Sequence, residues 1–147
     1  MSSSQAQTPL AADTAQFSTT DVMRFSGATF RRLDHWCRIG ALVPTVNARG
    51  SGSRRRYTAH EARCAWVIRV AQDLADATSR GGRSITMVAD AVRHLDPWGG
   101  TLVIGSGAPL VVEHALALLD ALAELGPAAV VIDLDACPNP LAQEAAA

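Results

Sequence analysis

The stretch from Thr29 to Tyr57, TFRRLDHWCRIGALVPTVNARGSGSRRRY, decides the fold that we expect. Thr29 can cap a short basic helix over residues 29–39, and Gly40 can end it because glycine readily adopts the left-handed conformation. Residues 42–46 and 54–57 then flank a loop whose glycines suit a hairpin turn. The stretch therefore predicts a helix followed by a β-hairpin wing over residues 43–57.

A short basic helix beside a hairpin rich in arginine has the properties of a double-stranded DNA reader. An α-helix fits the major groove, where base edges can be read, and arginines on a neighbouring wing can reach phosphates. A solvated basic surface without a ligand is the plainer interpretation of such arginines. We favour DNA binding because the arginines coincide with a helix and a wing.

Charge is segregated along the 147-residue chain, although the formal net charge is only −1. Residues 22–56 contain eight arginines and the single acid Asp34, a net charge of +7. From His94 onward there is no Lys or Arg, and seven acids give −7. A polyanion would therefore be attracted to one part of the molecule and repelled by the other, whatever the total charge.

Other composition features narrow the class of protein. The three cysteines, Cys37, Cys64 and Cys137, are odd in number and far apart, which indicates a reducing compartment. The N-terminus lacks the basic start and long apolar core of a signal peptide, and no apolar run is long enough to span a bilayer as one helix. His60 and Cys64 could share a helical face, but no second pair has zinc-like spacing. We expect a cytoplasmic protein with no metal and no cofactor.

The residues before Thr29 predict the first half of a helix-turn-helix. Residues 1–17 offer little to bury and are expected to form a mobile tail. Ser18 begins an S-x-x-D capping box, and a glycine turn at 26–27 separates this helix from the second. In the second helix Phe30, Leu33, Trp36 and Cys37 form the expected inward stripe, with Trp36 in the core and His35 on the polar side.

Two further helices and a β-rich segment follow. Thr58 and Glu61 form a T-x-x-E capping box for a helix to about residue 76, with Leu74 among its inward residues, and Ser84 is expected to cap a fourth. Residues 101–104 and 110–113 read as a hairpin, 114–125 as a helix and 129–134 as a buried strand. This ββαβ unit has a helix that is apolar on most sides, which indicates that it also buries a partner surface.

At residues 18–95 the chain resembles the DNA-binding domain of MerR-family transcription regulators. Residues 27–44, GATFRRLDHWCRIGALVP, follow the family pattern G-x-S then V-R-x-L-R-Y-Y-E-R-x-G-L-L-x-P. Residues 55–61, RRYTAHE, follow its wing ending R-x-Y-S/T-x-x-D/E, and residues 84–88, SITMV, follow the S-L-x-x-I start of its fourth helix. The long coiled-coil helix and the cysteine set of metal-sensing members are missing.

The resemblance implies roles for individual residues. It places Thr29, Arg31, Arg32 and His35 at major-groove and phosphate contacts, Arg38 at the helix end, and Arg55 and Tyr57 on the wing. His35 and Trp36 replace the family's paired tyrosines, and Asp34 replaces an arginine. Together with the other wing arginines, the predicted DNA-binding residues are Thr29, Arg31, Arg32, His35, Arg38, Arg49, Arg54, Arg55, Arg56 and Tyr57.

The sequence thus predicts an α+β protein: an N-terminal winged helix-turn-helix of about four helices and a β-wing over residues 18–96, then a ββαβ unit over 101–136 and a frayed tail over 138–147. The leading function is a sequence-specific DNA-binding transcription regulator. An excisionase-like or architectural factor acting with a recombinase uses the same contact chemistry and stays open. A protein-interaction module is a third hypothesis.

No recognisable catalytic set has suitable spacing, so we expect no enzyme. Double-stranded DNA is the expected partner, bound by a homodimer or a higher homo-oligomer. The ββαβ unit is expected to self-associate or to receive RNA polymerase or another protein, and no membrane partner is expected.

Overall fold

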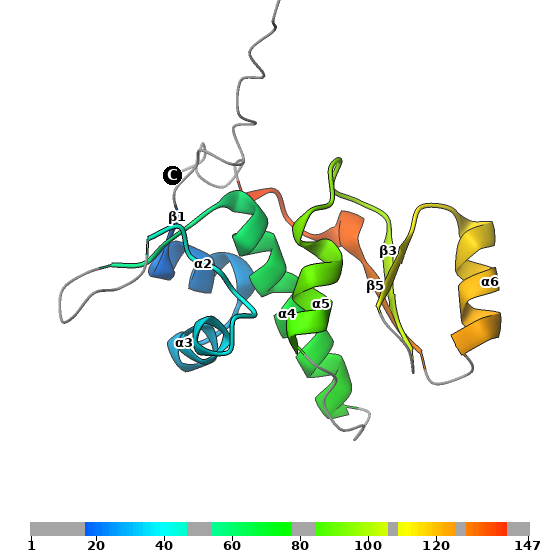
Figure 1. Cartoon of the computed structure of the whole chain (residues 1–147), viewed down its shortest axis with the longest axis horizontal. Helices are drawn as coiled ribbons and strands as arrows, with labels where there is room; N and C mark the ends of the chain where they lie inside the picture. Colours follow the sequence, from blue (N-terminus) through cyan, green and yellow to red (C-terminus); the bar gives the residue numbers. More distant parts are fainter. Residues whose placement is uncertain (1–16, 47–53, 78–84, 106–108, 126–128, 141–147) are drawn as a thin grey trace, which may run out of the picture.

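The computed structural model describes residues 17–46, 54–77, 85–105, 109–125 and 129–140. Within these residues the chain forms five α-helices and two small antiparallel sheets, so the expected α+β class is confirmed. Helices α2 and α3 lie at one end of the long axis, α4 and α5 in the middle, and a three-stranded sheet covered by α6 at the other end (Figure 1).

Local capping signals place the first two helices. Helix α2 (Thr19–Ser26) has Ser18 as its N-cap, and the reciprocal bonds between Ser18 and Asp21 complete the predicted capping box. Gly27, with φ of 75°, ends α2 in the left-handed conformation. The Thr29 hydroxyl accepts the Arg32 amide at 3.3 Å and caps helix α3 (Phe30–Arg38), as predicted.

The expected hairpin has an antiparallel base that involves a third segment. Strand β2 (Arg56–Tyr57) bridges Val46 on one side and pairs with strand β1 (Phe17–Ser18) on the other. Phe17 is buried, so the tail expected over residues 1–17 was wrong at its last residue, which is held by this pairing. Residues 47–53, the expected loop between the wing strands, lie outside the described residues.

Two helices form the middle of the molecule. Helix α4 (Ala59–Ala77) buries Cys64, Val67 and Ile68, and helix α5 (Ile85–Arg93) packs against it through Val88, Ala89 and Val92. The Thr58 hydroxyl accepts the Glu61 amide at 3.2 Å, as expected of a cap. The Glu61 carboxylate, by contrast, accepts hydrogen bonds from Val43 and Arg93. The expected cap of α5 at Ser84 lies outside the described residues.

The C-terminal part has the predicted ββαβ order. Strand β3 (Thr101–Ile104) lies between strands β4 (Leu110–Val112) and β5 (Val130–Asp133), and both pairings are antiparallel. Helix α6 (Ala115–Leu125) packs on one face of this sheet, and the short 3-10 helix η1 (Leu134–Ala136) follows β5. Gly100, with φ of 90°, lets the chain enter β3 close to the Val112 carbonyl.

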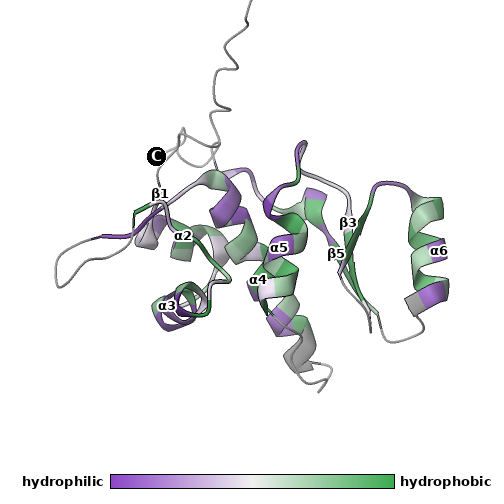
Figure 2. Ribbon diagram, in the orientation of Figure 1, coloured by the Kyte–Doolittle hydropathy of each residue, from purple (hydrophilic) through white to green (hydrophobic). Residues whose placement is uncertain are grey.

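One hydrophobic core connects the two expected units. Alternation in the strands sends Leu102, Ile104 and Ile132 towards the core that contains α4, while Val103 and Val112 face α6. The Trp98 indole N–H donates to the Leu134 carbonyl at 2.9 Å. This hydrogen bond links the segment between α5 and β3 to the residue that follows β5. Figure 2 shows apolar colouring on the helix faces that meet in the middle and more polar colouring on α3.

Two expected inward residues are exposed. Phe30 is 59% exposed, because at 100° per residue it lies about a quarter turn away from the direction shared by Leu33 and Trp36. Those two residues alone are fully buried in α3. Leu74 is also exposed, near the C-terminal end of α4, which projects beyond its neighbours (Figure 1). The predicted inward positions were therefore wrong at Phe30 and Leu74 and right at Leu33 and Trp36.

A buried ion pair joins three segments behind α3. Arg93 Nε lies 2.8 Å from Glu61 Oε1, and their side chains are only 16% and 7% exposed. The same carboxylate accepts the Val43 amide at 2.9 Å, and Arg93 donates to the Ala41 carbonyl at 2.7 Å. Helices α4 and α5 thereby hold the loop that leaves α3.

Replacing Glu61 with alanine should destabilise the protein by about 3–5 kcal/mol, because Arg93 would lose its buried charge partner and keep only the exposed Asp90, and the Val43 amide would lose its acceptor. The control is Asp90→Ala, which removes an exposed carboxylate that pairs with the same arginine and should cost less than about 1 kcal/mol. Urea denaturation gives both free energies of unfolding. Equal losses in the two variants would contradict the role assigned to the buried pair.

Candidate nucleic-acid interface

Helix α3 presents a basic face opposite its buried face. Arg31, His35 and Arg38 are exposed and follow one another at i, i+4 and i+7, so they lie on one side of the helix. Leu33 and Trp36 point into the core. The fold therefore brings together three of the predicted site residues on a single exposed surface.

Arg32 faces helix α4 instead. Its guanidinium lies 3.1 Å from Asp73, which also pairs with Arg69 at 2.8 Å. Arg69 in turn donates to the Ser26 carbonyl, near the end of α2. Arg32 thus contributes to the packing of α3 on α4, and its charge is partly offset by Asp73, which also pairs with Arg69.

Asp34 joins the helix to the base of the wing. One carboxylate oxygen lies 2.7 Å from Arg38 and the other 2.8 Å from Arg55. The hydrogen bond from Arg55 lowers the pKa of Asp34 and raises the pKa of Arg55. Arg38 keeps 74% of its side chain exposed, whereas Arg55 keeps only 20%. We call Arg38, Asp34 and Arg55 the Asp34 clasp.

The wing strands present other arginines. Arg54 is exposed and Arg56 half-buried, and neither forms an ion pair with another described residue. Backbone bonds between Arg56 and residues Thr45 and Val46 hold this part of the base. Arg49 lies outside the described residues.

Tyr57 does not have the exposed position that its predicted contact with DNA requires. Its side chain is fully buried, and its hydroxyl lies 3.4 Å from the Cys37 thiol. Burial raises the pKa of both groups. Side chains alternate along β2, so the side chain that follows Arg56 points towards the core and not towards solvent. The buried Tyr57 side chain links strand β2 at the base of the wing to Cys37 of α3.

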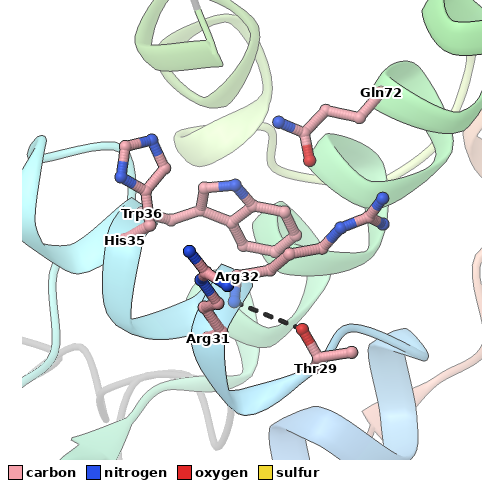
Figure 3. A pocket seen from close by; sticks show the side chains of 6 residues that line it. All are labelled: Thr29, Arg31, Arg32, His35, Trp36 and Gln72. Atoms are coloured by element: carbon pink, nitrogen blue, oxygen red, sulfur yellow. Dashed lines mark hydrogen bonds between the residues drawn. The ribbon is translucent and has the colours of Figure 1, made fainter.

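A surface pocket of about 400 Å³ opens between α3 and α4. Figure 3 shows the side chains around it, with the Trp36 indole across its floor and Gln72 approaching from α4. Its lining consists of Thr29, Arg31, Arg32, His35, Trp36 and Gln72. Gln72 was not predicted as a site residue. A single glutamine on a long helix does not indicate which other helix its side chain will face.

Metal binding receives no support from the described residues. They contain no group of three or more His, Cys, Asp and Glu side chains that could hold a metal ion. The thiol of Cys64 is buried beside the Ala89 carbonyl, and burial raises its pKa as well as that of Cys137, the latter to about 12. Elevated thiol pKa values disfavour the thiolate that a metal needs. Within the same residues, no helix has the length and apolarity to cross a membrane.

No protein-family model matches the chain, and no curated protein is similar enough to count as a relative.

The Asp34 clasp predicts a pH dependence with a definite sign. Because the pKa of Asp34 is lower in the folded than in the unfolded protein, its stabilising effect exists above the unfolded value of about 3.9 and is lost as pH falls through the folded value. Wild type should therefore have a larger free energy of unfolding than Asp34→Asn at neutral pH, and this difference should disappear at acidic pH.

Urea denaturation across that pH range measures the gap. Asp96→Asn is the control, because Asp96 is exposed and no ion pair involving it occurs among the described residues. A gap for Asp34→Asn that is equally large at pH 7 and in acid would show that the charge of Asp34 contributes nothing.

Proposed function

We propose that the protein is a double-stranded DNA-binding transcription regulator whose N-terminal part is a winged helix-turn-helix of the MerR type. In this proposal α3 is the recognition helix and residues 43–57 form the wing. One observation carries it: Arg31, His35 and Arg38 share the exposed face of a short helix beside a β-base that supplies Arg54 and Arg56.

The dimensions support insertion into the major groove. A nine-residue helix is about 14 Å long and, with side chains, about 10–12 Å wide, close to the groove width of about 12 Å. Arginine can bind guanine through two parallel hydrogen bonds, and arginine and histidine can both donate to phosphate oxygens. Arg31, with no ion pair to any described residue, is the best candidate for a base contact.

The Asp34 clasp supports the proposal through preorganisation. It fixes the base of the wing relative to α3 before any ligand is present, which reduces the ordering cost of binding. Asp34 also cancels one of the two arginine charges that it holds. Phosphate attraction in this region therefore depends mainly on the arginines outside the clasp, Arg31, Arg54 and Arg56.

Self-association through α6 is the second part of the proposal. Leu116 and Leu119 are 77% and 62% exposed and lie one turn apart on α6, where Ala121 is the only buried residue among those whose burial is described, 115–124. We assign this face to a second copy of the chain, with the two α6 helices antiparallel. Pairing Leu116 with Leu119 of the second copy would set each Asp120 beside the other helix's N-terminal turn, where the helix dipole favours negative charge. A two-fold dimer presents two recognition helices to DNA.

Arg31→Ala should weaken DNA binding by about 1–3 kcal/mol and lower the salt dependence of the binding constant by about one counterion. Arg63→Ala is the control: it removes the same charge from a guanidinium that stacks over Trp98, 5.3 Å from the ring centre. Mobility-shift titrations on genomic fragments at several salt concentrations measure both. Equal affinities and slopes for the two variants would contradict the assignment of α3.

Leu119→Glu should shift the protein from dimer to monomer, because the new charge would be buried against the second copy's apolar face. Ala136→Glu adds the same charge at an exposed position after β5 and should leave the dimer intact. Sedimentation equilibrium gives the molar mass of each variant. If the wild type is a monomer at high concentration, the α6 pairing is ruled out, while the DNA-binding proposal is unaffected.

A further inference from the structure

Phe30 exposes a large aromatic ring on the helix that we assign to DNA. Its side chain is 59% exposed, and it belongs to neither of the two hydrophobic core clusters. A ring in this position contributes little to folding, because the hydrophobic effect stabilises only through surface that is removed from water. The inward role predicted for Phe30 is therefore not available to explain it.

The ring lies beside the basic face of α3, on the side of the wing. Phe30 is one turn before Asp34, whose carboxylate contacts Arg55 at the base of the wing. At 100° per residue, Phe30 is about a quarter turn away from both Arg31 and Arg38, the two arginines of the exposed face. A duplex held by that face would therefore have the ring next to it.

The place of Phe30 within the helix selects the kind of group that it can meet. It is the first residue of α3, and the N-terminal residues of a recognition helix are those that contact base edges in helix-turn-helix complexes. The major groove presents one methyl group on its base edges, the C5-methyl of thymine, and phenylalanine can contact it without a hydrogen bond. Phosphates and the other groups of the base edges require a polar partner, which this side chain does not have.

We propose that Phe30 contacts the C5-methyl group of a thymine in the major groove and thereby gives the protein a preference for thymine at one position of its binding site. The inference rests on the proposed DNA-binding function and names a base that α3 reads. Phe30 and Arg31 then differ in what they recognise. Arg31 donates hydrogen bonds to guanine or phosphate, whereas Phe30 recognises a methyl group by apolar contact.

A methyl contact can be removed from the DNA without changing the base pairing. Uracil pairs with adenine as thymine does and lacks only the methyl group, so a thymine-to-uracil replacement removes the contact and leaves the hydrogen-bonding groups in place. Burial of one methyl-sized group predicts a loss of about fourfold in affinity. The salt dependence should stay unchanged, because neither the ring nor the methyl group carries a charge.

The experiment begins with selection of binding sites from a random-sequence duplex pool by the wild-type protein. Each preferred thymine is then replaced in turn by uracil, and mobility-shift titrations of wild type and Phe30→Ala measure the affinities for both duplexes. We expect one position at which uracil weakens wild-type binding about fourfold and leaves the binding of Phe30→Ala unchanged. That interaction between one side chain and one methyl group is the signature of direct contact.

Met87→Ala is the matched control. It removes another exposed apolar side chain, 48% exposed, from α5, which contributes no residue to the proposed DNA surface. This variant should keep the fourfold loss with uracil. Urea denaturation checks that both variants fold, and Phe30→Leu, which keeps part of the apolar contact, should retain part of the thymine preference.

Two results would overturn the inference while DNA binding stands. One is a wild type that binds the selected duplexes with no loss at any uracil position, a result that needs no variant. The other is a loss of the same size in wild type and Phe30→Ala, which would assign the methyl contact to a different residue. A wild type that binds no duplex at all would contradict the proposed function itself, and the inference with it.

Discussion

The carboxylate of Glu61 is the point on which the arrangement of the N-terminal half depends. It is almost fully buried, and such a charge is tolerated only when its lone pairs are occupied. Arg93 from α5 and the Val43 amide occupy them, and Arg93 reaches on to the Ala41 carbonyl. The exit of α3 is thereby fixed to two other helices. The direction of α3, and with it the direction of its basic face, follows from satisfying one buried charge.

Features set by nearby residues could be predicted from the sequence. The caps at Ser18 and Thr29 depend on contacts within three residues, and the C-terminal strands coincide with short runs of β-prone residues; all appear where expected. The pairing of Phe17 with Tyr57 and the continuous core could not be predicted, because they join segments distant in sequence. The burial of Tyr57 could not be predicted either, because an aromatic ring with a hydroxyl suits a surface contact and a core position equally well.

The arginines divide into structural and exposed groups, a division that composition alone does not show. Arg32, Arg55, Arg69 and Arg93 form ion pairs that hold helices and the wing base together. Arg31 and Arg54 face solvent. The charge count over residues 22–56 treats Arg31, Arg32, Arg54 and Arg55 alike, whereas the folded chain leaves a smaller set for a ligand. The acids that make the difference, Asp34, Glu61 and Asp73, all come from the first half of the chain.

The positions of α3 and α6 at opposite ends of the long axis have an electrical consequence (Figure 1). Basic residues gather towards one end and the acids of the last third towards the other, so the centres of positive and negative charge are well separated although the formal net charge is −1. Such a molecule has a large permanent dipole moment. In the field of a polyanion such a molecule experiences a torque, which biases its rotational diffusion so that encounters occur with the arginine end first.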